Sequence, residues 1–271
     1  MDWSQIVLLI GLGILVGFIG TLIGAGGGFI LVPILLFIYP TVRPEVITSI
    51  SLGVVFLNAC SGSIAYAGMK RIDYKSALIF AIATLPGAVI GALLTRYIPR
   101  GTFDIILGMI LLIISIFLLI KPDYKGTLKI KKPHHAVYRT ITDSKGEHYS
   151  YAFNLWTGII LSFFIGFISS LLGIGGGIIH VPALTALLGF PIHIATATSH
   201  FILAVMALAG TIVHIYQGNF RSEWITTLSI GTGVIIGAQF GAYYSHHVKP
   251  HWIIRALAIA LLLVGIRLVF M

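Results

Sequence analysis

Charged residues are scarce in this chain of 271 residues: they make up 9% of it, whereas hydrophobic residues make up 58%. Soluble globular proteins contain about 25% charged residues, and disordered chains combine low hydrophobicity with high charge. The composition therefore excludes both classes. The mean hydropathy is +1.03, and many apolar runs approach the roughly 20 residues of a helical membrane span. We therefore expect an all-α polytopic transmembrane protein rather than a β-barrel.

Cysteine and acidic residues are also scarce. Cys60 is the single cysteine, so the chain can form neither an internal disulfide nor a cysteine metal cluster, and we expect no metal site and no cofactor. The chain has 17 Lys and Arg against 8 Asp and Glu. In a membrane protein, such an excess is typical of cytoplasmic loops. We therefore expect a lipid bilayer, and no nucleic acid, as the partner of these basic residues.

No carboxylate stands out within an apolar run. Besides Asp2 near the start of the chain, the acidic residues outside the polar stretch fall near predicted loops or helix ends: Glu45, Asp73, Asp104 and Glu223. This placement disfavours a carboxylate-based cation pump and fits a small anionic substrate better. A histidine can still carry a proton, because its unperturbed pKa is near 6.5, so proton coupling is open to the protein.

The apolar runs form two groups of five, separated by a polar stretch. We therefore divide the chain into a first transmembrane repeat (residues 1–120), a polar basic linker (121–150) and a second transmembrane repeat (151–271). The linker contains seven Lys or Arg and three acidic residues, so we expect it in the cytoplasm. Its segments Val137–Thr142 and Glu147–Tyr151 predict a small β-hairpin.

The two groups of runs are internally homologous. The pattern G-x-G-G-G-x-x-x-V-P occurs in Gly20–Pro33 and again in Ser169–Pro182, and further along Thr48-Ser49 aligns with Thr198-Ser199. Duplicated halves are typical of secondary transporters. The sequence therefore predicts two tandem homologous repeats.

Each glycine motif is expected to break a helix. One helix over residues 6–39 would be about 51 Å long, whereas the hydrocarbon core of a bilayer is about 30 Å thick. The segments after the glycines, Phe29–Tyr39 and Ile178–Phe190, are too short to span it. We therefore predict that both are half-helices or re-entrant segments. Such backbone is tolerated at membrane depth only inside protein or beside a watery cavity.

The charge bias leaves two topologies open. If each half crosses the membrane five times, the halves are inverted and both termini lie opposite the linker. If each half crosses four times, both termini lie on the linker's side. Both arrangements place 11 basic residues inside and 4 outside. We favour the inverted arrangement, because broken helices often accompany it.

The glycine motifs are the first candidate binding site. Successive unhindered N–H groups at the start of a helix can bind an anion. The alternative is close helix packing, which is all that we expect of Gly13 and Gly17, of Gly87 and Gly91, and of Gly233, Gly237 and Gly241. Two matched motifs, each ahead of a half-helix, favour a site.

Polar side chains within apolar runs are the next candidates, because they are costly in a bilayer. Each could instead cap a helix or bond a neighbouring backbone. His200 is preferred to His214, which lies about 21 Å away along one helix and near the predicted membrane surface. The predicted substrate-binding residues are Gly24, Gly26, Gly27, Gly28, Thr48, Ser49, Asn58, Gly173, Gly175, Gly176, Gly177, His180, Thr198, Ser199 and His200.

The repeated motif, the paired Thr-Ser segments and the loop Arg71–Tyr74 resemble the sulfite exporter TauE/SafE family of bacterial and archaeal permeases. The resemblance covers nearly the whole chain. It implies a permease, not an enzyme, in the prokaryotic plasma (inner) membrane, for sulfite, sulfonates or related organosulfur anions. As the mechanism we expect the two repeats to rock about a shared site and so alternate access. The sequence leaves the anion, the direction and the oligomeric state open.

Two other classes of function stay open. One is a non-transporting membrane scaffold that presents the linker to a cytoplasmic partner. The other is an intramembrane enzyme, because Ala59-Cys60-Ser61-Gly62 faintly resembles the nucleophile motif of intramembrane serine proteases. That motif normally begins with glycine, where this chain has Ala59, so the enzyme is disfavoured.

Overall fold

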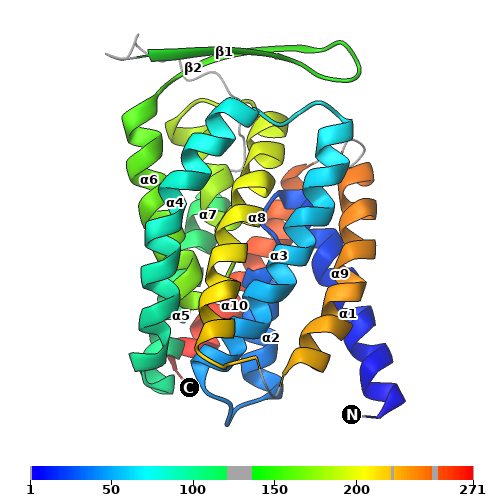
Figure 1. Cartoon of the computed structure of the whole chain (residues 1–271), viewed down its shortest axis with the longest axis vertical. Helices are drawn as coiled ribbons and strands as arrows, with labels where there is room; N and C mark the ends of the chain where they lie inside the picture. The colour runs from blue at the N-terminus through cyan, green and yellow to red at the C-terminus, as the bar shows by residue number, and fades with distance from the viewer. Residues whose placement is uncertain (1, 121–135, 221–222, 246–249, 271) are drawn as a thin grey trace.

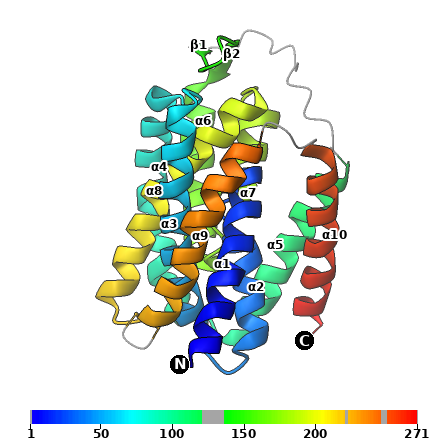
Figure 2. The same cartoon turned by 90° about the vertical axis from the view of Figure 1, so that its right-hand side faces the viewer.

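The computed structural model describes residues 2–120, 136–220, 223–245 and 250–270. The first half contains α1 (Trp3–Ile23), α2 (Gly28–Ile38), α3 (Pro44–Gly68), α4 (Tyr74–Leu94), the short η1 (Thr95–Tyr97) and α5 (Arg100–Ile120). The second half contains β1 (Ala136–Thr142), β2 (His148–Asn154), α6 (Leu155–Leu172), α7 (Gly177–Pro182), the π-helical η2 (Ala183–Leu187), α8 (Ile192–Tyr216), α9 (Trp224–Tyr244) and α10 (Pro250–Val269). Figures 1 and 2 show one upright bundle of helices with the two strands across one end.

The bundle is a multi-pass membrane protein. Among the described residues, seven helices are long and apolar enough to cross a bilayer: α1, α3, α4, α5, α6, α8 and α9, with η1 extending α4. Exposed aromatic side chains stand at helix ends, among them Trp3, Trp156 and Trp224. Such residues favour the two interfaces between lipid and water. The polytopic all-α fold predicted from composition is therefore confirmed.

Glycines bring the membrane helices into close contact in pairs. On α1 and α9, a Cβ added at Gly13 or Gly233 would overlap the backbone of the other helix, and Gly17, Gly237 and Gly241 repeat this arrangement. On α4 and α6, Gly87 and Gly91 do the same. The packing role predicted for these glycines is confirmed. The first helix of each predicted repeat thus packs against the fourth helix of the other, although the duplication itself stays a prediction.

The structure distinguishes the two topologies. The hairpin lies at one end of the bundle and both chain termini lie at the opposite end (Figure 1). Arg71, between α3 and α4, pairs with Asp143 of the hairpin. Arg100, at the start of α5, donates to the Val42 carbonyl oxygen at the end of the bundle opposite the hairpin. The two halves therefore run in opposite directions, and the alternative with termini and linker on one side is wrong.

Both glycine motifs end a helix, as predicted. Gly24 and Gly173 adopt left-handed conformations, with φ of 85° and 68°, directly after α1 and α6. The segments that follow, α2 and the α7–η2 pair, are half-helices of 11 residues and of 6 plus 5 residues. Neither is long enough to span a bilayer, because an α-helix rises only about 1.5 Å per residue.

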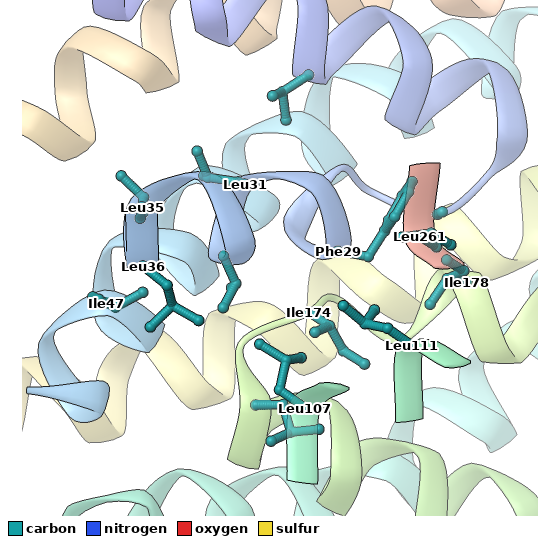
Figure 3. Close-up of a cluster of buried hydrophobic side chains, with 14 of the residues drawn as sticks. Phe29, Leu31, Leu35, Leu36, Ile47, Leu107, Leu111, Ile174, Ile178 and Leu261 are labelled. Carbon is teal, nitrogen blue, oxygen red and sulfur yellow. The ribbon is translucent and has the colours of Figure 1, made fainter. Parts of the chain in front are cut away.

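The half-helices are buried among apolar side chains. Figure 3 shows Phe29 of α2, Ile178 of α7, Leu107 and Leu111 of α5 and Leu261 of α10 in one cluster. Non-helical backbone at membrane depth requires such enclosure, since lipid offers it no hydrogen bonds. The pair α5 and α10 therefore covers one side of the centre.

The linker is partly structured. The predicted hairpin is confirmed: its strands are antiparallel, with Ala136 opposite Asn154 at one end and Thr142 opposite His148 at the other. Residues 121–135 of the linker lie outside the described residues. Strand β2 continues past the predicted boundary at residue 150 and leads directly into α6. The side chains of Arg71 and Asp143 are 3% and 1% exposed and lie 3.1 Å apart. The hairpin is therefore docked on the α3–α4 loop by a buried ion pair.

Our first prediction compares two glycines of α1. Gly13→Ala places a Cβ against the carbonyl of Ile230, and such overpacking typically costs about 1–3 kcal/mol. Gly11→Ala is the matched control, because nothing lies within 4 Å of its added Cβ. Thermal unfolding in detergent should show a lower Tm for the Gly13 variant alone. Equal Tm values would contradict the described α1–α9 contact.

Our second prediction concerns Asp143. Burial opposes ionisation of its carboxyl, but N–H donors from Glu147, Arg71 and Lys145 outweigh burial and hold the pKa below its ordinary value. The stabilisation is therefore complete above the unfolded-state pKa near 3.9 and is lost as pH falls through the lower folded pKa. The protection factors of the amides of residues 136–154, that is, their exchange relative to an unfolded chain at the same pH, should stay high from pH 8 to 5 and fall below about pH 4.

Asp143→Asn removes the same charge at neutral pH. Leaving one partner of a buried ion pair uncompensated costs about 3–5 kcal/mol, so amide exchange in the hairpin should accelerate at pH 7. Glu147→Gln serves as the control, because the Glu147 side chain is exposed. Unchanged protection in the Asp143 variant would show that the ion pair does not dock the hairpin.

Candidate functional site

The two glycine motifs cross each other at the centre of the bundle. Gly28, at the start of α2, lies against the carbonyl groups of Gly173 and Ile174. Gly177, at the start of α7, lies against the carbonyl of Gly24 and against Ala25. The positive N-terminal end of each half-helix therefore faces the carbonyls that end the opposing helix, an arrangement that the helix dipoles favour.

The N–H groups of the first motif are largely used by α1 itself. Gly24 N–H donates to the Thr21 carbonyl oxygen at 3.0 Å and Gly26 N–H to that of Gly20 at 3.1 Å. Backbone donors that end a helix are consumed by its last carbonyls. In this conformation the N–H groups of Gly24 and Gly26 are therefore occupied by backbone acceptors. Within the described chain, the N–H groups of Gly27 and Gly28 have no backbone acceptor.

The second motif is built in the same way but is not identical. Gly173 and Gly175 have positive φ values, and added Cβ atoms would meet Thr48 and Val55 respectively. Gly176 has an ordinary helical φ of −58° and lies beside the Ser169 hydroxyl. The N–H groups of Gly176 and Gly177 have no backbone acceptor among the described residues.

Two serines bind the opposing motifs and correct the sequence alignment. Ser51 Oγ donates to the Gly173 carbonyl oxygen at 2.6 Å, and Ser199 Oγ donates to that of Gly24 at 3.4 Å. Ser51 and Ser199 are thus equivalent in their contacts. This pair defines which residue of α3 corresponds to which residue of α8. The alignment of Thr48-Ser49 with Thr198-Ser199 is therefore wrong by two residues. Ser51 was missed, although it lies on the same helical face as Asn58.

The other predicted hydroxyls do not share a pocket. Thr48 Oγ1 donates to the Glu45 carbonyl oxygen and Ser49 Oγ to that of Val46, both within their own helix. Thr198 Oγ1 accepts the N–H of Asp73 from the α3–α4 loop. Of the four predicted hydroxyls, Ser199 alone reaches a glycine motif. Ser and Thr side chains commonly bond carbonyls one turn back in their own helix, which the sequence could not distinguish from ligand binding.

A polar cluster, formed by Thr21, Asn58, Tyr66 and His200, lies beside the crossing. Thr21 Oγ1 donates to Asn58 Oδ1 at 2.9 Å, and His200 Nε2 lies 3.3 Å from Thr21 Oγ1. Tyr66 OH donates to the Thr21 carbonyl oxygen at 2.8 Å. Gly62 leaves room for the imidazole, since an added Cβ would contact its Nε2 and Cδ2. The structure therefore brings two of the predicted residues, Asn58 and His200, to one hydroxyl.

Two polar atoms of this cluster have no hydrogen-bond partner within the described structure. They are Asn58 Nδ2 and His200 Nδ1, and both side chains are fully buried. The Ser169 and Ser170 hydroxyls at the end of α6 are also buried and unpartnered. A buried polar group without a partner costs about 1–3 kcal/mol. Such groups therefore mark the place where a polar ligand would be stabilising.

The cluster is on one side of the crossing only. In the register set by Ser51 and Ser199, His200 corresponds to Leu52 and Asn58 to Met206. Gly62 packs against His200 and Thr21, whereas Gly210 packs against Leu52 and Ser170. The site is therefore chemically asymmetric.

The other singled-out side chains lie apart from the cluster. His180 Nε2 is 3.3 Å from Ser162 Oγ between α7 and α6. His214, in the last turn of α8, is fully buried, with contacts to Thr48 and Asn219. Ser61 Oγ donates to a carbonyl oxygen of α9 rather than contacting a histidine. Within the part of the chain that the structure describes, no group of three His, Cys, Asp or Glu could hold a metal.

Comparisons with known proteins agree with the fold. The family model for the sulfite exporter TauE/SafE matches residues 9–268. The chain is 34% identical to the probable membrane transporter protein YunE of Bacillus subtilis, with 97% of each chain covered. It is 29% identical to a probable membrane transporter protein of Methanocaldococcus jannaschii, covering 90% of this chain and 87% of the relative. No solved structure matches. The chain therefore belongs to the TauE/SafE sulfite exporter family.

Proposed function

We propose that the protein transports a small sulfur-containing anion, such as sulfite or an organosulfonate, across the prokaryotic plasma membrane. The family to which the chain belongs supports this class of substrate. The charge distribution supports an anion, because the ion pairs of the described residues involve loops or helix ends: Arg43–Glu45, Arg71–Asp143, Arg100–Asp104 and Arg139–Asp73. Among those residues, no carboxylate contacts the polar cluster to repel an anion or to hold a sodium ion.

The observation on which the proposal rests is the unpartnered amide of Asn58. Its Nδ2 is a donor, it is fully buried beside the crossing, and its Oδ1 is held by Thr21. An amide fixed in this way presents its N–H groups to one place. A sulfonate or sulfite oxygen would satisfy them with a charge-assisted hydrogen bond, the stronger kind.

Alternating access is supported by the way the helices pack. The pairs α1–α9 and α4–α6 are joined backbone to backbone through glycines, so each pair can move as one body. The two motifs, in contrast, meet through a few glycines and two serine hydrogen bonds. We propose that the pairs rock about this crossing and expose the cluster to one side at a time. The hairpin end faces the cytoplasm in this proposal, in accord with its basic residues.

Flux into proteoliposomes tests the proposal. Sulfite, a sulfonate, sulfate and chloride are compared with folded protein and with empty vesicles. Selective flux of sulfite or the sulfonate is expected. Flux of none of these anions through folded protein would contradict the proposal and would favour the scaffold.

Our third prediction concerns Asn58. Asn58→Leu keeps the branched shape and the number of heavy atoms but removes the donor, so anion flux should fall at least tenfold, corresponding to about 1.4 kcal/mol or more. Met206→Leu is the control at the corresponding position of α8 and should retain flux. Size-exclusion profiles of both variants verify folding. Wild-type flux in a folded Asn58 variant would remove this amide from the site.

A further inference from the structure

We propose that His200 carries one proton together with each transported anion, so that the protein is a proton–anion cotransporter. This inference rests on the proposed function and specifies the coupling ion and the residue that binds it. It is argued from the hydrogen bonds of the polar cluster and from what protonation does to the groups left without partners.

The hydrogen bonds determine which imidazole nitrogen has the proton in the neutral state. Thr21 Oγ1 has one hydrogen, which it donates to Asn58 Oδ1 at 2.9 Å. Its oxygen can therefore only accept from His200 Nε2, 3.3 Å away. Neutral histidine has one N–H and one acceptor nitrogen, so with Asn58 Oδ1 turned toward Thr21 the hydrogen of neutral His200 is on Nε2. His200 Nδ1 is then a bare acceptor, and it has no hydrogen-bond partner among the described residues.

A bare acceptor cannot bind an anion, but a protonated one can. Adding a proton at Nδ1 gives the imidazolium two donors and a positive charge, without disturbing the bond to Thr21. The unpartnered Asn58 Nδ2 belongs to the amide whose Oδ1 accepts from the same Thr21 hydroxyl. The bound proton therefore favours binding of the anion, because it places a charged donor on a side chain that shares this hydroxyl with the amide. The bound anion favours protonation, because it compensates a buried charge that would otherwise be costly.

The surroundings of the ring contain no competing charge within the described structure. Tyr66 of α3 is the titratable side chain in contact, with ring centroids 5.5 Å apart, and its hydroxyl already donates to the Thr21 carbonyl. From α1 the ring meets Thr21, and the carbonyls of Thr196 and Gly24 also face it. No Asp, Glu, Lys or Arg of the described residues contacts it. The anion itself is therefore the counter-ion that protonated His200 lacks.

His214 shows why His200 differs from an ordinary buried histidine. It is also fully buried, but its Nδ1 lies 3.0 Å from Asn219 Nδ2 and its Nε2 3.5 Å from Thr48 Oγ1. The amide donates to Nδ1, so both nitrogens face partners in the neutral state. A proton added at Nδ1 would oppose the amide donor. His214 is therefore the matched control.

Coupling changes what drives transport. A monoanion moving alone responds to the membrane potential, which supplies a factor of about 50 in accumulation per 100 mV. A monoanion moving with one proton is electrically neutral, so the potential has no effect. The pH gradient then drives transport, with tenfold accumulation per pH unit.

The experiment uses proteoliposomes with two separate assays of a sulfonate, which stays a monoanion throughout the pH range of the test, whereas sulfite itself takes up a proton near neutral pH. The first measures net uptake under an imposed pH gradient, with the potential clamped either at zero or at an inside-negative value and with an internal pH dye. The second measures exchange of labelled anion at equal concentration and equal pH. The wild type should take up one proton per anion, accumulate about tenfold per pH unit and ignore the potential.

Variants assign the proton to its residue. His200→Gln should abolish accumulation driven by pH, and its exchange, though slower, should not change between pH 5.5 and 7.5. His214→Gln should retain pH-driven accumulation. A measurement without variants accompanies them: anion added to weakly buffered detergent-solubilised protein should remove about one proton from solution.

The outcomes separate this inference from the proposed function. Anion flux in the wild type without proton movement, or pH-driven accumulation retained in His200→Gln, would overturn the role of His200 and leave the proposed transport intact. A wild type without flux in both assays would overturn the proposed function, and the inference with it.

Discussion

The rest of the structure depends on one constraint: two stretches of non-helical backbone must be enclosed at membrane depth. Lipid offers no hydrogen bonds to such backbone. The protein solves this by crossing the two motifs, so that the glycines of each lie against the carbonyls of the other. Ser51 and Ser199 add one hydrogen bond to each opposing motif. Glycine is required here because a Cβ at Gly28 or Gly177 would separate the motifs.

The crossing leaves both backbone and side-chain donors near its centre. The carbonyls at the end of α1 take the N–H groups of Gly24 and Gly26, whereas those of Gly27, Gly28, Gly176 and Gly177 have no backbone acceptor among the described residues. The unpartnered polar side-chain atoms beside the crossing belong to Asn58, His200, Ser169 and Ser170. Asymmetry arises in the same place, because the residues that correspond to His200 and Asn58 on the other side are apolar. The crossing therefore supports a polar cluster on one side only.

The sequence predicted the architecture because length and hydropathy are strong constraints in a bilayer. It predicted the broken helices, the half-helices and the hairpin, since the run from Ile6 to Tyr39 is too long for one span and its glycines show where it must break. It also selected Asn58 and His200, because polar side chains in apolar runs are rare. It could not show that Thr48 and Thr198 bond locally or to a loop, since those bonds depend on rotamers and neighbours.

Sequence reasoning could not predict the role of the Thr21 hydroxyl, or which residues of α3 and α8 correspond, for a related reason. Thr21 is an ordinary residue of an apolar helix, and its role appears only when α3 and α8 meet it from other parts of the chain. The spacing that aligns the two glycine motifs also differs from the spacing between Ser51 and Ser199. A small difference in loop length decides which hydroxyls lie opposite each other, and the amino-acid composition does not show this difference.

The most direct test of this account is a structure with a selenium analogue of the anion, such as selenite, located by its anomalous scattering. The account predicts a selenium peak beside Asn58 Nδ2 and His200 Nδ1, within hydrogen-bonding reach of both. A peak at the N–H groups of Gly27 or Gly176, away from that pair, would contradict the central place given to the polar cluster.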